Sequence, residues 1–445
     1  MPLSDSAAAD QAKELLEFRQ AEAGRLEEIR EYLRDDPERR LAGLPAGVPR
    51  EVHQLARISR VNFLRFVVAS RVQSMYVDGF RAPRASDDAP AWQAWQANGM
   101  DARQIGIHRA ALSYGAAYMT VLPGEPVPVM RGVSPRHLTA VYGDDDQWPV
   151  YALQKRRSDW RLFDDQAVYT LVKDGDGFRV VSVAEHGAQM DGRPVCPVVR
   201  YRDTDDLDDP VTGIVWPLRS LQDQINATSF ELQVAQHYGA FRVRYVIGWL
   251  AESEQQKLKM TASNLLTFED SPSDVQVGEF AETNLKGYID SREASLRHLA
   301  TISQTAAHEL LGQLINLSAE ALAAAEASHR RAVSENQMCI GESHEQALRL
   351  AGTYMGQVPD AAAAVRWRDT ESRSLAQVAD ALGKLAAQLG IPPQELWERI
   401  PGVTDDELDR WRAAAERGDA LGNLAALLER QAAEPEQAEA AGGVA

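Results

Sequence analysis

Gly312-Gln313-Leu314-Ile315-Asn316-Leu317-Ser318 separates two long helical patterns, and the rest of the chain is organised around this short stretch. Glycine commonly follows the last residue of a helix and serine is a preferred N-cap, so Gly312 is expected to end one helix and Ser318 to begin the next. Leu317 and Leu322 occupy the two positions of a hydrophobic staple around that cap. The pattern predicts a helix over 285–311, a loop over 312–318 and a long helix over 319–355.

Upstream of the loop, apolar side chains recur three and four residues apart in two separate segments. This spacing is typical of helices that bury one face, and it predicts helices over 217–237 and 285–311. Neutral amides are frequent on the other faces of the first segment. The residues that form the two apolar stripes are Leu218, Leu221, Ile225, Thr228, Leu232 and Ala235, followed by Leu296, Leu299, Ile302, Ala306 and Leu310.

A small mixed segment, about 241–283, separates these two helices. It predicts a strand from Phe241 to Ile247, a polar helix over Glu252–Met260 and a second strand near Val275. The helix predicted over 319–355 would overhang the core of a compact monomer. The layout therefore favours helices that pack against copies of the same chain.

The N-terminal part changes from helical to strand-like periodicity near residue 115. Helices are predicted over 6–34, 51–73 and 101–114, the last with Asp101 as its N-cap. The apolar pattern then has a period of two, with turns rich in Gly and Asp, and we expect a mostly antiparallel α+β domain closed by a solvated acidic linker near 203–210. Its strands are expected at 117–122, 127–131, 137–142, 149–157, 167–173, 178–185 and 195–201.

The C-terminal part is expected to be helical. Residues 372–389 carry an apolar stripe that ends at Gly390, and Thr404 with Glu407 forms a capping box for a further helix. The expected fold class is thus α+β and predominantly helical.

Composition restricts the class of protein. The chain has 445 residues, a formal net charge of −18, 44% hydrophobic residues and two cysteines. No apolar run is long enough to span a bilayer, no signal peptide is visible, and two cysteines make no disulfide framework, so we expect a soluble protein of a reducing compartment. Clustered Lys and Arg for wholesale phosphate binding are lacking.

Motifs with a defined chemistry are incomplete. The pair Gly383-Lys384 has no upstream glycine of a phosphate-binding loop. His308-Glu309 and His344-Glu345 begin like zinc-protease helices, but neither has a second histidine four residues after the first. The sequence therefore predicts no enzyme, no cofactor and no metal.

One acidic cluster leaves an alternative open. Asp203 to Asp209 could hold a hard cation such as calcium, although the glycine and the terminal glutamate of an EF-hand are missing. An acidic surface loop is the simpler interpretation. A metal-dependent hydrolase built on this cluster is kept as a minor alternative.

Several segments, taken in their order along the chain, resemble the portal proteins of tailed double-stranded-DNA bacteriophages, in the branch typical of long-tailed phages. The resemblance extends over roughly residues 15–425. The segments that carry it are Arg60-Val61-Asn62-Phe63, Val77-Asp78-Gly79-Phe80, Trp95 to Asp101, Ala111 to Tyr118, Leu221-Gln222-Asp223-Gln224-Ile225-Asn226, Asn316 to Leu322, Val365-Arg366-Trp367-Arg368-Asp369 and Leu389-Gly390-Ile391-Pro392-Pro393.

The resemblance implies a portal-like architecture. Its parts would be an N-terminal helix and α+β wing over 1–215, stem helices over 216–239 and 284–311, a small α/β clip over 240–283, a tunnel loop over 312–318, a long kinked wing helix and return over 319–369, a helical crown over 370–430 and a disordered tail over 431–445.

The resemblance also implies partners and a location. The chain would form a homo-oligomeric ring, usually a dodecamer, at one capsid vertex of the virion, and would be in the host cytoplasm during assembly. A terminase large subunit would pump double-stranded DNA through the ring without sequence specificity, and the DNA would later leave by the same route. Major capsid and scaffolding proteins and a head–tail adaptor would be further partners, and no membrane is implied. Another virion ring, adaptor or scaffold is the alternative within the structural class.

Candidate DNA-channel residues follow from the loop. Leu314, Ile315 and Asn316 would approach DNA sterically rather than read bases, although Leu314 and Ile315 could instead be ordinary packing residues between helices. An acidic ring would resist gripping phosphates and would let DNA slide. The remaining candidate site residues belong to two groups. Leu317, Ser318 and Leu322 would cap the tunnel helix, and the stem helices would contribute Leu221, Ile225, Leu232, Leu299 and Ile302.

Overall fold

The computed structural model divides the chain into two compact units, Met1–Arg368 and Asp369–Ala445, which are described separately. The described residues are 1–34, 47–82, 91–144, 147–208, 211–239, 244–247, 265–268, 276–279, 284–312, 319–357, 360–368, 375–400, 403, 407–408, 410–415 and 417. No helix among these residues is long and apolar enough to cross a membrane.

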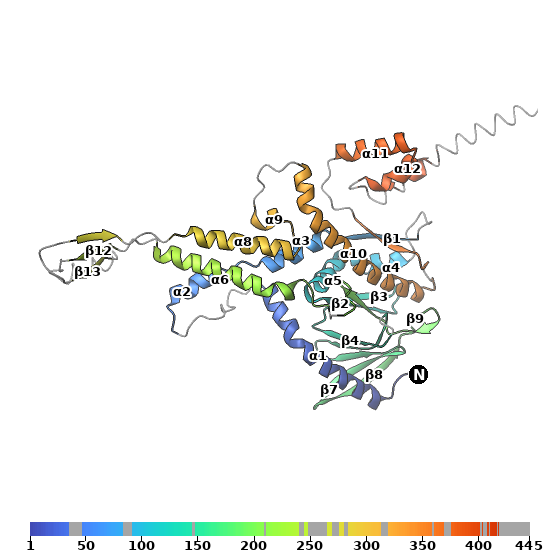
Figure 1. The fold of residues 1–445 in the computed structure, drawn as a ribbon. Coiled ribbons are helices and arrows are strands. Elements are labelled where there is room, and N and C mark those ends of the chain that lie inside the picture. Colours follow the sequence, from blue (N-terminus) through green and yellow to red (C-terminus); the bar gives the residue numbers. More distant parts are fainter. Residues whose placement is uncertain are drawn as a thin grey trace, which may run out of the picture. The chain divides into compact units, whose positions relative to one another are not determined.

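A five-stranded antiparallel sheet and the first helix form one layer pair of the first unit (Figure 1). The helix α1 (Asp5–Leu33) packs its small and apolar side chains, including Ala8, Ala12 and Leu15, against Tyr169 and its neighbours on the sheet. The strand order is β4-β5-β6-β7-β8. The strands are β4 (Leu138–Tyr142), β5 (Pro149–Lys155), β6 (Trp160–Phe163), β7 (Ala167–Asp174) and β8 (Gly177–Glu185).

One strand of this sheet was not predicted. The expected strand 149–157 ends at Lys155, because Arg156 N donates to the Asp159 carbonyl at 2.8 Å and turns the chain. The strand β6 then begins at Trp160.

A second antiparallel sheet, in the order β11-β2-β3, packs against helix α5 (Met100–Tyr114). Its strands are β2 (Ala116–Leu122), β3 (Val129–Val133) and β11 (Val198–Arg202), and a short hairpin of β9 (Gln189–Met190) and β10 (Arg193–Pro194) precedes β11. Gly115 ends α5 with φ +87, and a Cβ there would lie 2.4 Å from the Val211 carbonyl oxygen, so the close approach of the two chain segments requires glycine.

The predicted N-cap of α5 is wrong. Helix α4 (Ala91–Ala97) comes directly before α5, and Gly99, with φ 61, makes the tight turn between them at the N-cap position of α5. Asp101 lies in the first turn, where its carboxylate accepts a hydrogen bond from Trp95 Nε1 at 2.9 Å.

The single helix predicted over 51–73 is two helices, α2 (Arg50–Ile58) and α3 (Phe63–Gln73). Asn62 separates them because its side chain accepts from Arg65 N at 3.0 Å and so caps α3. After α3 the chain forms β1 (Val77–Arg81), which pairs antiparallel with the distant β15 (Ala364–Trp367).

The helices α6 (Val215–Gly239) and α8 (Lys286–Ile302) lie side by side and run in opposite directions (Figure 1). A three-stranded sheet lies between them in the sequence. Its central strand β12 (Arg244–Ile247) pairs parallel with β13 (Leu265–Phe268) and antiparallel with β14 (Gln276–Glu279). The polar helix predicted over Glu252–Met260 lies outside the described residues.

The continuous helix predicted over 285–311 is wrong, because α8 ends at Ile302 and a separate short helix α9 follows (Ala307–Leu311). Gln304 takes φ +51, Thr305 N donates to the Ala300 carbonyl at 3.0 Å, and Gln304 N donates to the Thr301 carbonyl at 3.3 Å. This pair of hydrogen bonds around a left-handed residue is a Schellman motif, which ends a helix. No glycine marks the position, so the sequence pattern did not reveal it.

Helix α10 (Ala319–Tyr354), with 36 residues, is the longest element among the residues that the structure describes. Figure 1 shows that it changes direction after its first turns. Its C-terminal half is buried through Ile340, Ala347, Leu348 and Ala351 in the main core.

The second unit is a small helical assembly. It contains α11 (Leu375–Leu389), α12 (Pro393–Leu396) and the 3₁₀ helix η1 (Trp397–Arg399). Gly390 follows α11 with φ +66, as expected for a helix-ending glycine. Trp397 and Trp411 meet edge to face with ring centroids 5.9 Å apart. Thr404 of the predicted capping box and the tail over 431–445 lie outside the described residues.

Candidate functional site

The α6–α8 pair is held together by apolar side chains from both helices. Leu218 and Ile225 of α6 and Leu296 and Leu299 of α8 are buried. One polar contact joins the helices at the same level, where Arg292 Nε donates to Ser229 Oγ at 3.1 Å.

The predicted stripe residues differ in their burial. Ile225 and Leu299 are fully buried, whereas Leu221 and Leu232 are half-buried. Ile302 was predicted in the buried stripe, but its side chain is 62% exposed. The buried face of α8 continues from Leu299 through Ala300 to Ser303, so Ile302 lies beyond its edge.

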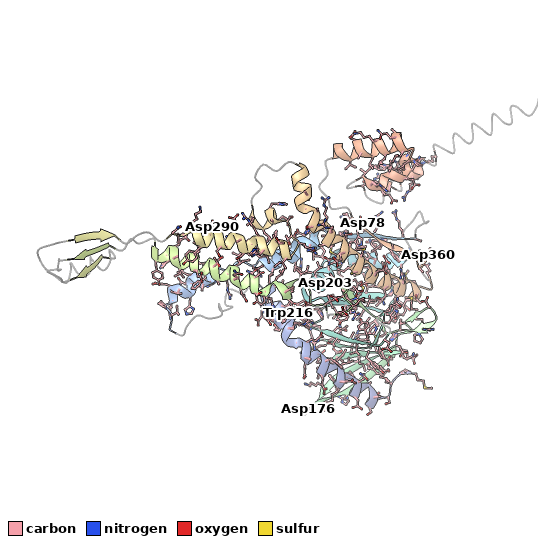
Figure 2. The ribbon with its side chains drawn as sticks, in the orientation of Figure 1. Asp78, Asp176, Asp203, Trp216, Asp290 and Asp360 are labelled. Atoms are coloured by element: carbon pink, nitrogen blue, oxygen red, sulfur yellow. The ribbon has the colours of Figure 1, made fainter. Side chains whose placement is uncertain are left out.

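The α6–α8 pair is nearly neutral. Segments 216–239 and 284–311 together carry four Lys and Arg and five Asp and Glu, although the whole chain has a net charge of −18. Asp290, labelled on α8 in Figure 2, is one of these few acidic residues. Most of the negative charge of the chain is therefore outside this pair.

Gln222 has a structural task that sequence analysis did not identify. Its buried side chain accepts from the backbone N–H groups of Phe63 and Leu64 at 3.0 and 3.3 Å and donates to the Val61 carbonyl at 2.8 Å. Four N–H groups at the start of any helix lack intrahelical partners. Gln222 of α6 thus supplies the acceptor for the first N–H groups of α3. Its amide is buried and is not free to contact a ligand outside the protein.

The same segment of α6 is attached to α1. Tyr32 donates its hydroxyl hydrogen to Asp223, and Arg219 forms an ion pair with Glu28. The Arg219 guanidinium also lies over the ring of Trp216, which is labelled at the start of α6 in Figure 2. These contacts form a first anchor, which fixes the N-terminal part of α6 to α1.

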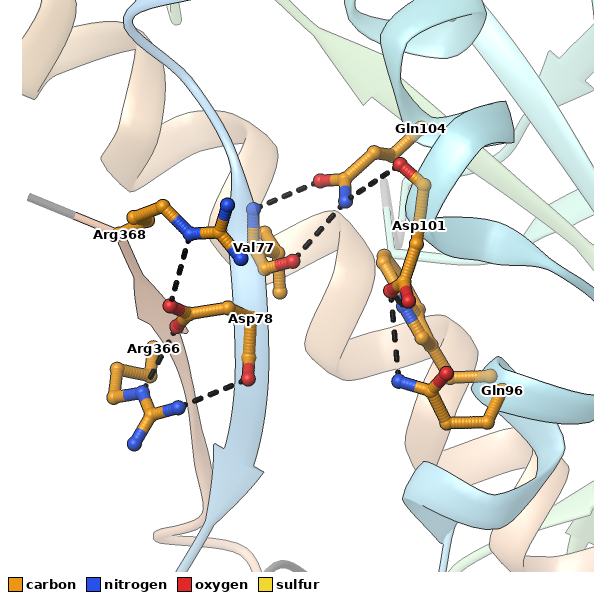
Figure 3. Close-up of polar contacts among 8 residues, drawn as sticks. Val77, Asp78, Gln96, Asp101, Gln104, Arg366 and Arg368 are labelled. Carbon is orange, nitrogen blue, oxygen red and sulfur yellow. Dashed lines mark hydrogen bonds and ion pairs between the residues drawn. The ribbon is translucent and has the colours of Figure 1, made fainter. Parts of the chain in front are cut away.

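A second anchor joins β1 to β15, far apart in the sequence (Figure 3). Arg366 donates through Nε to Asp78 Oδ1 at 2.9 Å and through Nη2 to the Asp78 carbonyl at 3.0 Å. Arg368 Nε lies 3.4 Å from Asp78 Oδ2, and Arg368 N donates to the Tyr76 carbonyl at 2.7 Å. One aspartate thus orients two arginines in the last residues of the first unit.

Gln104 extends this anchor into the core (Figure 3). The side chain is fully buried, accepts from Val77 N at 2.8 Å and donates to the Val77 carbonyl at 3.1 Å. Asp101, one turn earlier, holds Trp95. Segments 77–80, 95–101 and 365–368, which the sequence only places in order, therefore meet at one position in the fold.

Two histidines face each other in the core behind this anchor. His108 of α5 and His344 of α10 have Nε2 atoms 2.8 Å apart, and the Tyr201 hydroxyl lies 3.0 Å from His344 Nδ1. Burial lowers the pKa of His108 to about 4 and the pKa of His344 well below its ordinary value. Because both pKa values are lowered, both rings are neutral near pH 7, and in the contact between them one Nε2 donates and the other accepts. His344 is thus part of the core, and its neighbour Glu345 accepts from Val365 N.

The acidic cluster after β11 is not wholly solvated, which corrects the prediction for Asp203. Its side chain, labelled in Figure 2, is 4% exposed, and burial raises its pKa to about 7. Asp205 pairs with Arg202 at 2.8 Å, and Asp206 accepts from Asp208 N. In the described part of the chain, no group of three His, Cys, Asp or Glu side chains is arranged to hold a metal ion.

The predicted loop residues Leu314, Ile315, Asn316, Leu317 and Ser318 lie outside the described residues. Leu322 lies within α10, but its side chain is also outside them.

Comparison with known proteins gives relatives across most of the chain. It is 26% identical over 414 residues to the portal protein of Mycobacterium phage L5, covering 87% of this chain and 84% of that protein. The portal protein of Mycobacterium phage D29 is 25% identical over the same length, with the same coverage.

Solved structures with similar chains come from gene transfer agent particles. A chain in the structure of the neck of the empty particle matches 80% of this chain over 94% of its own length, with 14% identity and a TM-score of 0.47. A chain in the structure of the virion of the native particle matches 79% of this chain over 96% of its own length, with 16% identity and a TM-score of 0.46.

The family model described as phage portal protein, SPP1 Gp6-like, matches residues 12–420. This match includes both anchors, the α6–α8 pair with its inserted sheet, and all but the first turns of α1. The chain therefore belongs to the family of SPP1 Gp6-like phage portal proteins.

Proposed function

We propose that this chain forms a dodecameric ring at one vertex of a phage capsid, and that viral DNA enters and later leaves through the ring. The family match over residues 12–420 carries this proposal. A head-to-tail contact between identical subunits closes into a ring when the rotation permits. The chain would act as a structural conduit, with no catalytic role of its own and no cofactor.

We assign the parts of the chain to the ring as follows. Residues 1–215 would form the wing, 216–239 and 284–311 the stem, 240–283 the clip and 312–318 the tunnel loop. Residues 319–369 would return through the wing along α10, and 370–430 would form the crown inside the capsid. The antiparallel α6–α8 pair with a small sheet between its two helices in the sequence supports the stem and clip assignments.

The charge distribution supports a sliding contact with DNA. Each phosphate that a protein neutralises adds a salt-dependent attraction, and many such contacts would arrest movement. The near-neutral α6–α8 pair would avoid that attraction. In the tunnel loop, Leu314, Ile315 and Asn316 would contact DNA without reading its sequence, and Leu317, Ser318 and Leu322 would cap the helix that follows.

The partners follow from this placement. The clip would contact the terminase large subunit during packaging and the head–tail adaptor afterwards, and the ATPase would supply the energy. Capsid and scaffolding proteins would surround the wing. The chain would be a virion component, assembled in the host cytoplasm.

A packaging experiment tests this function. Procapsids would be assembled with and without this chain, supplied with terminase, ATP and DNA, and then treated with nuclease. We expect nuclease-protected DNA only in procapsids that contain the chain. Equal protection in procapsids that lack it would refute the conduit role.

A further inference from the structure

A buried arginine connects three elements at the end of α8. Arg71 of α3 is only 4% exposed. Its Nη2 donates to the Ser303 carbonyl at 2.6 Å, and its Nη1 donates to Asn336 Oδ1 at 2.8 Å. Asn336 in turn donates through Nδ2 to the Asp203 carbonyl at 2.6 Å. One guanidinium thus joins the C-terminus of α8 to the middle of α10.

The Ser303 carbonyl is a significant partner because it belongs to the C-cap of α8. The last carbonyl groups of a helix lack intrahelical donors and carry the negative end of the helix dipole. A cationic donor at this position satisfies the carbonyl and favours the ending of the helix. Arg71 therefore stabilises the turn at which α8 stops and the chain continues toward α9.

The same face of α3 contacts the elements on both sides of this turn. Ser70 donates its hydroxyl hydrogen to Glu309 of α9 at 2.9 Å. The Ser74 carbonyl accepts from Gln337 of α10 at 3.3 Å. Successive turns of α3 therefore hold α8, α9 and α10 in one arrangement, with Arg71 at the centre.

Burial of this charge is costly, so stability alone gives a weak reason for an arginine here. The guanidinium donates to two neutral oxygens, and burial lowers its pKa, while the more distant charges of Asp203 and Glu335 oppose this effect. Replacing a buried charged network as a whole by apolar side chains of similar volume is often neutral or stabilising, so a buried charge is weak evidence for stability. What an apolar side chain cannot do is donate to two helices at once in a fixed geometry.

We infer that Arg71 is a positioning residue for DNA passage, which holds the end of stem helix α8 at a fixed place on α10. This inference rests on the proposed conduit function, in which α8 lies along the channel. DNA moving along α8 pushes on its end, and the Arg71 bridge passes that load to α10 and the core of the wing. The ring assembles without the bridge but moves or retains DNA poorly.

The test compares Arg71→Met with a matched control, Arg57→Met, which makes the same change at an exposed position on α2. Each variant is measured for ring formation by negative-stain images, for amide hydrogen exchange, and for nuclease-protected DNA in procapsids. In Arg71→Met rings we expect exchange to rise about tenfold in the peptides covering 300–312, with little change at 218–230, because only the attached end of α8 is released. We expect protected DNA to fall at least as strongly, while Arg57→Met matches the wild type.

A third variant keeps the inference testable if Arg71→Met does not fold. Asn336→Leu retains the arginine and removes its contact with α10, and it should show the same selective exchange and the same loss of protected DNA. Arg71→Lys retains the charge but not the two-pronged geometry, so it should lie between the wild type and Arg71→Met.

Rings of Arg71→Met or Asn336→Leu that protect as much DNA as the wild type would overturn the inference, and so would exchange that rises equally in all helices. Failure of the conduit function itself gives a different result. Procapsids would then protect DNA equally with or without the wild-type chain, whereas the exchange measurement would still report on the bridge.

Discussion

Acidification should destabilise the folded chain through the buried His108–His344 pair. A hydrogen bond between two Nε2 atoms 2.8 Å apart needs one donor and one acceptor, so protonation of both rings breaks it. Both side chains are fully buried. Their unfolded-state pKa values are those of exposed histidines, near 6.5.

The sign and size follow from the pKa of His108, which burial lowers to about 4. Below pH 6.5 the unfolded chain binds a proton at this residue that the folded chain does not bind. Stability is therefore fully present above about pH 6.5 and is lost progressively as the pH falls toward 4. For His108 alone the loss amounts to about 2 kcal/mol at pH 5. His344, whose pKa is also lowered, adds to the loss.

Asp203 acts in the opposite direction. Its pKa is raised from 3.8 to about 7 by burial, so the folded chain holds a proton that the unfolded chain releases. Protonation of Asp203 therefore raises the free energy of unfolding as the pH falls from about 7 toward 4. In the wild type this increase partly offsets the loss of stability caused by the two histidines. A comparison of variants that share Asp203 removes it.

The assay is denaturant unfolding of the wild type and His108→Gln between pH 7.5 and 5.0, at one protein concentration because assembly contributes to stability. Glutamine keeps a hydrogen-bonding amide beside His344 and does not titrate. We expect the free energy of unfolding to fall by about 2 kcal/mol less in His108→Gln than in the wild type by pH 5. His53→Gln, at an exposed position on α2, is the control and should follow the wild type. Parallel curves for the wild type and His108→Gln would refute the argument.

Four further predictions follow from other contacts. Gln222→Leu leaves the first N–H groups of α3 without an acceptor and should lower the free energy of unfolding by about 2–4 kcal/mol, measured by denaturant titration; an unchanged midpoint would show that water replaces the amide. Gln304→Gly relieves a left-handed backbone at a residue with φ +51 and should raise the stability by about 0.5–1 kcal/mol, seen as a higher Tm, and a lower Tm would contradict the strain argument. Asp78→Ala removes the acceptor of two partly exposed arginines, so it should cost only about 1 kcal/mol and speed amide exchange in β15 selectively. Glu231→Lys on the exposed face of α6 should slow DNA packaging and make it more salt-dependent, and an unchanged rate would count against a sliding contact.

Periodicity predicted the elements whose signals are local. The alternating apolar residues before Leu122 and the Asp174-Gly175-Asp176-Gly177 turn correspond to β2 and to the β7–β8 hairpin. Glycine marks the end of α5 at Gly115 and of α11 at Gly390, where the left-handed backbone is cheap for that residue. Such signals require no knowledge of distant parts of the chain.

The missed features depend on tertiary partners or on residues that give no signal. Gln304 ends α8 in a conformation usually taken by glycine, so the apolar stripe continued past the true end and placed Ile302 in the core. Asn62 divides the expected helix 51–73 by a cap that is visible only once Arg65 N is seen to donate to it. Asp203 lies among exposed acidic residues in the sequence, yet it is buried beside Asn336.

The sequence predicted the apolar part of the candidate site but not its polar part. The apolar stripes located the α6–α8 pair because burial of one helix face leaves a periodic trace. The polar residues that fix its ends, Gln222 and Arg71, leave none, since the α3, α8 and α10 groups that they join across the fold are 158 or more residues away. The roles of the loop residues Leu314, Ile315 and Asn316 remain predictions from family resemblance.

The mass and symmetry of the assembled chain test the central claim most directly. Light scattering combined with class-averaged negative-stain images of the purified protein would measure both. We predict a closed ring of about twelve copies, with a central hole wide enough for a DNA duplex. A chain that stays monomeric, even when it is produced together with its capsid and scaffolding proteins, would contradict the conduit function.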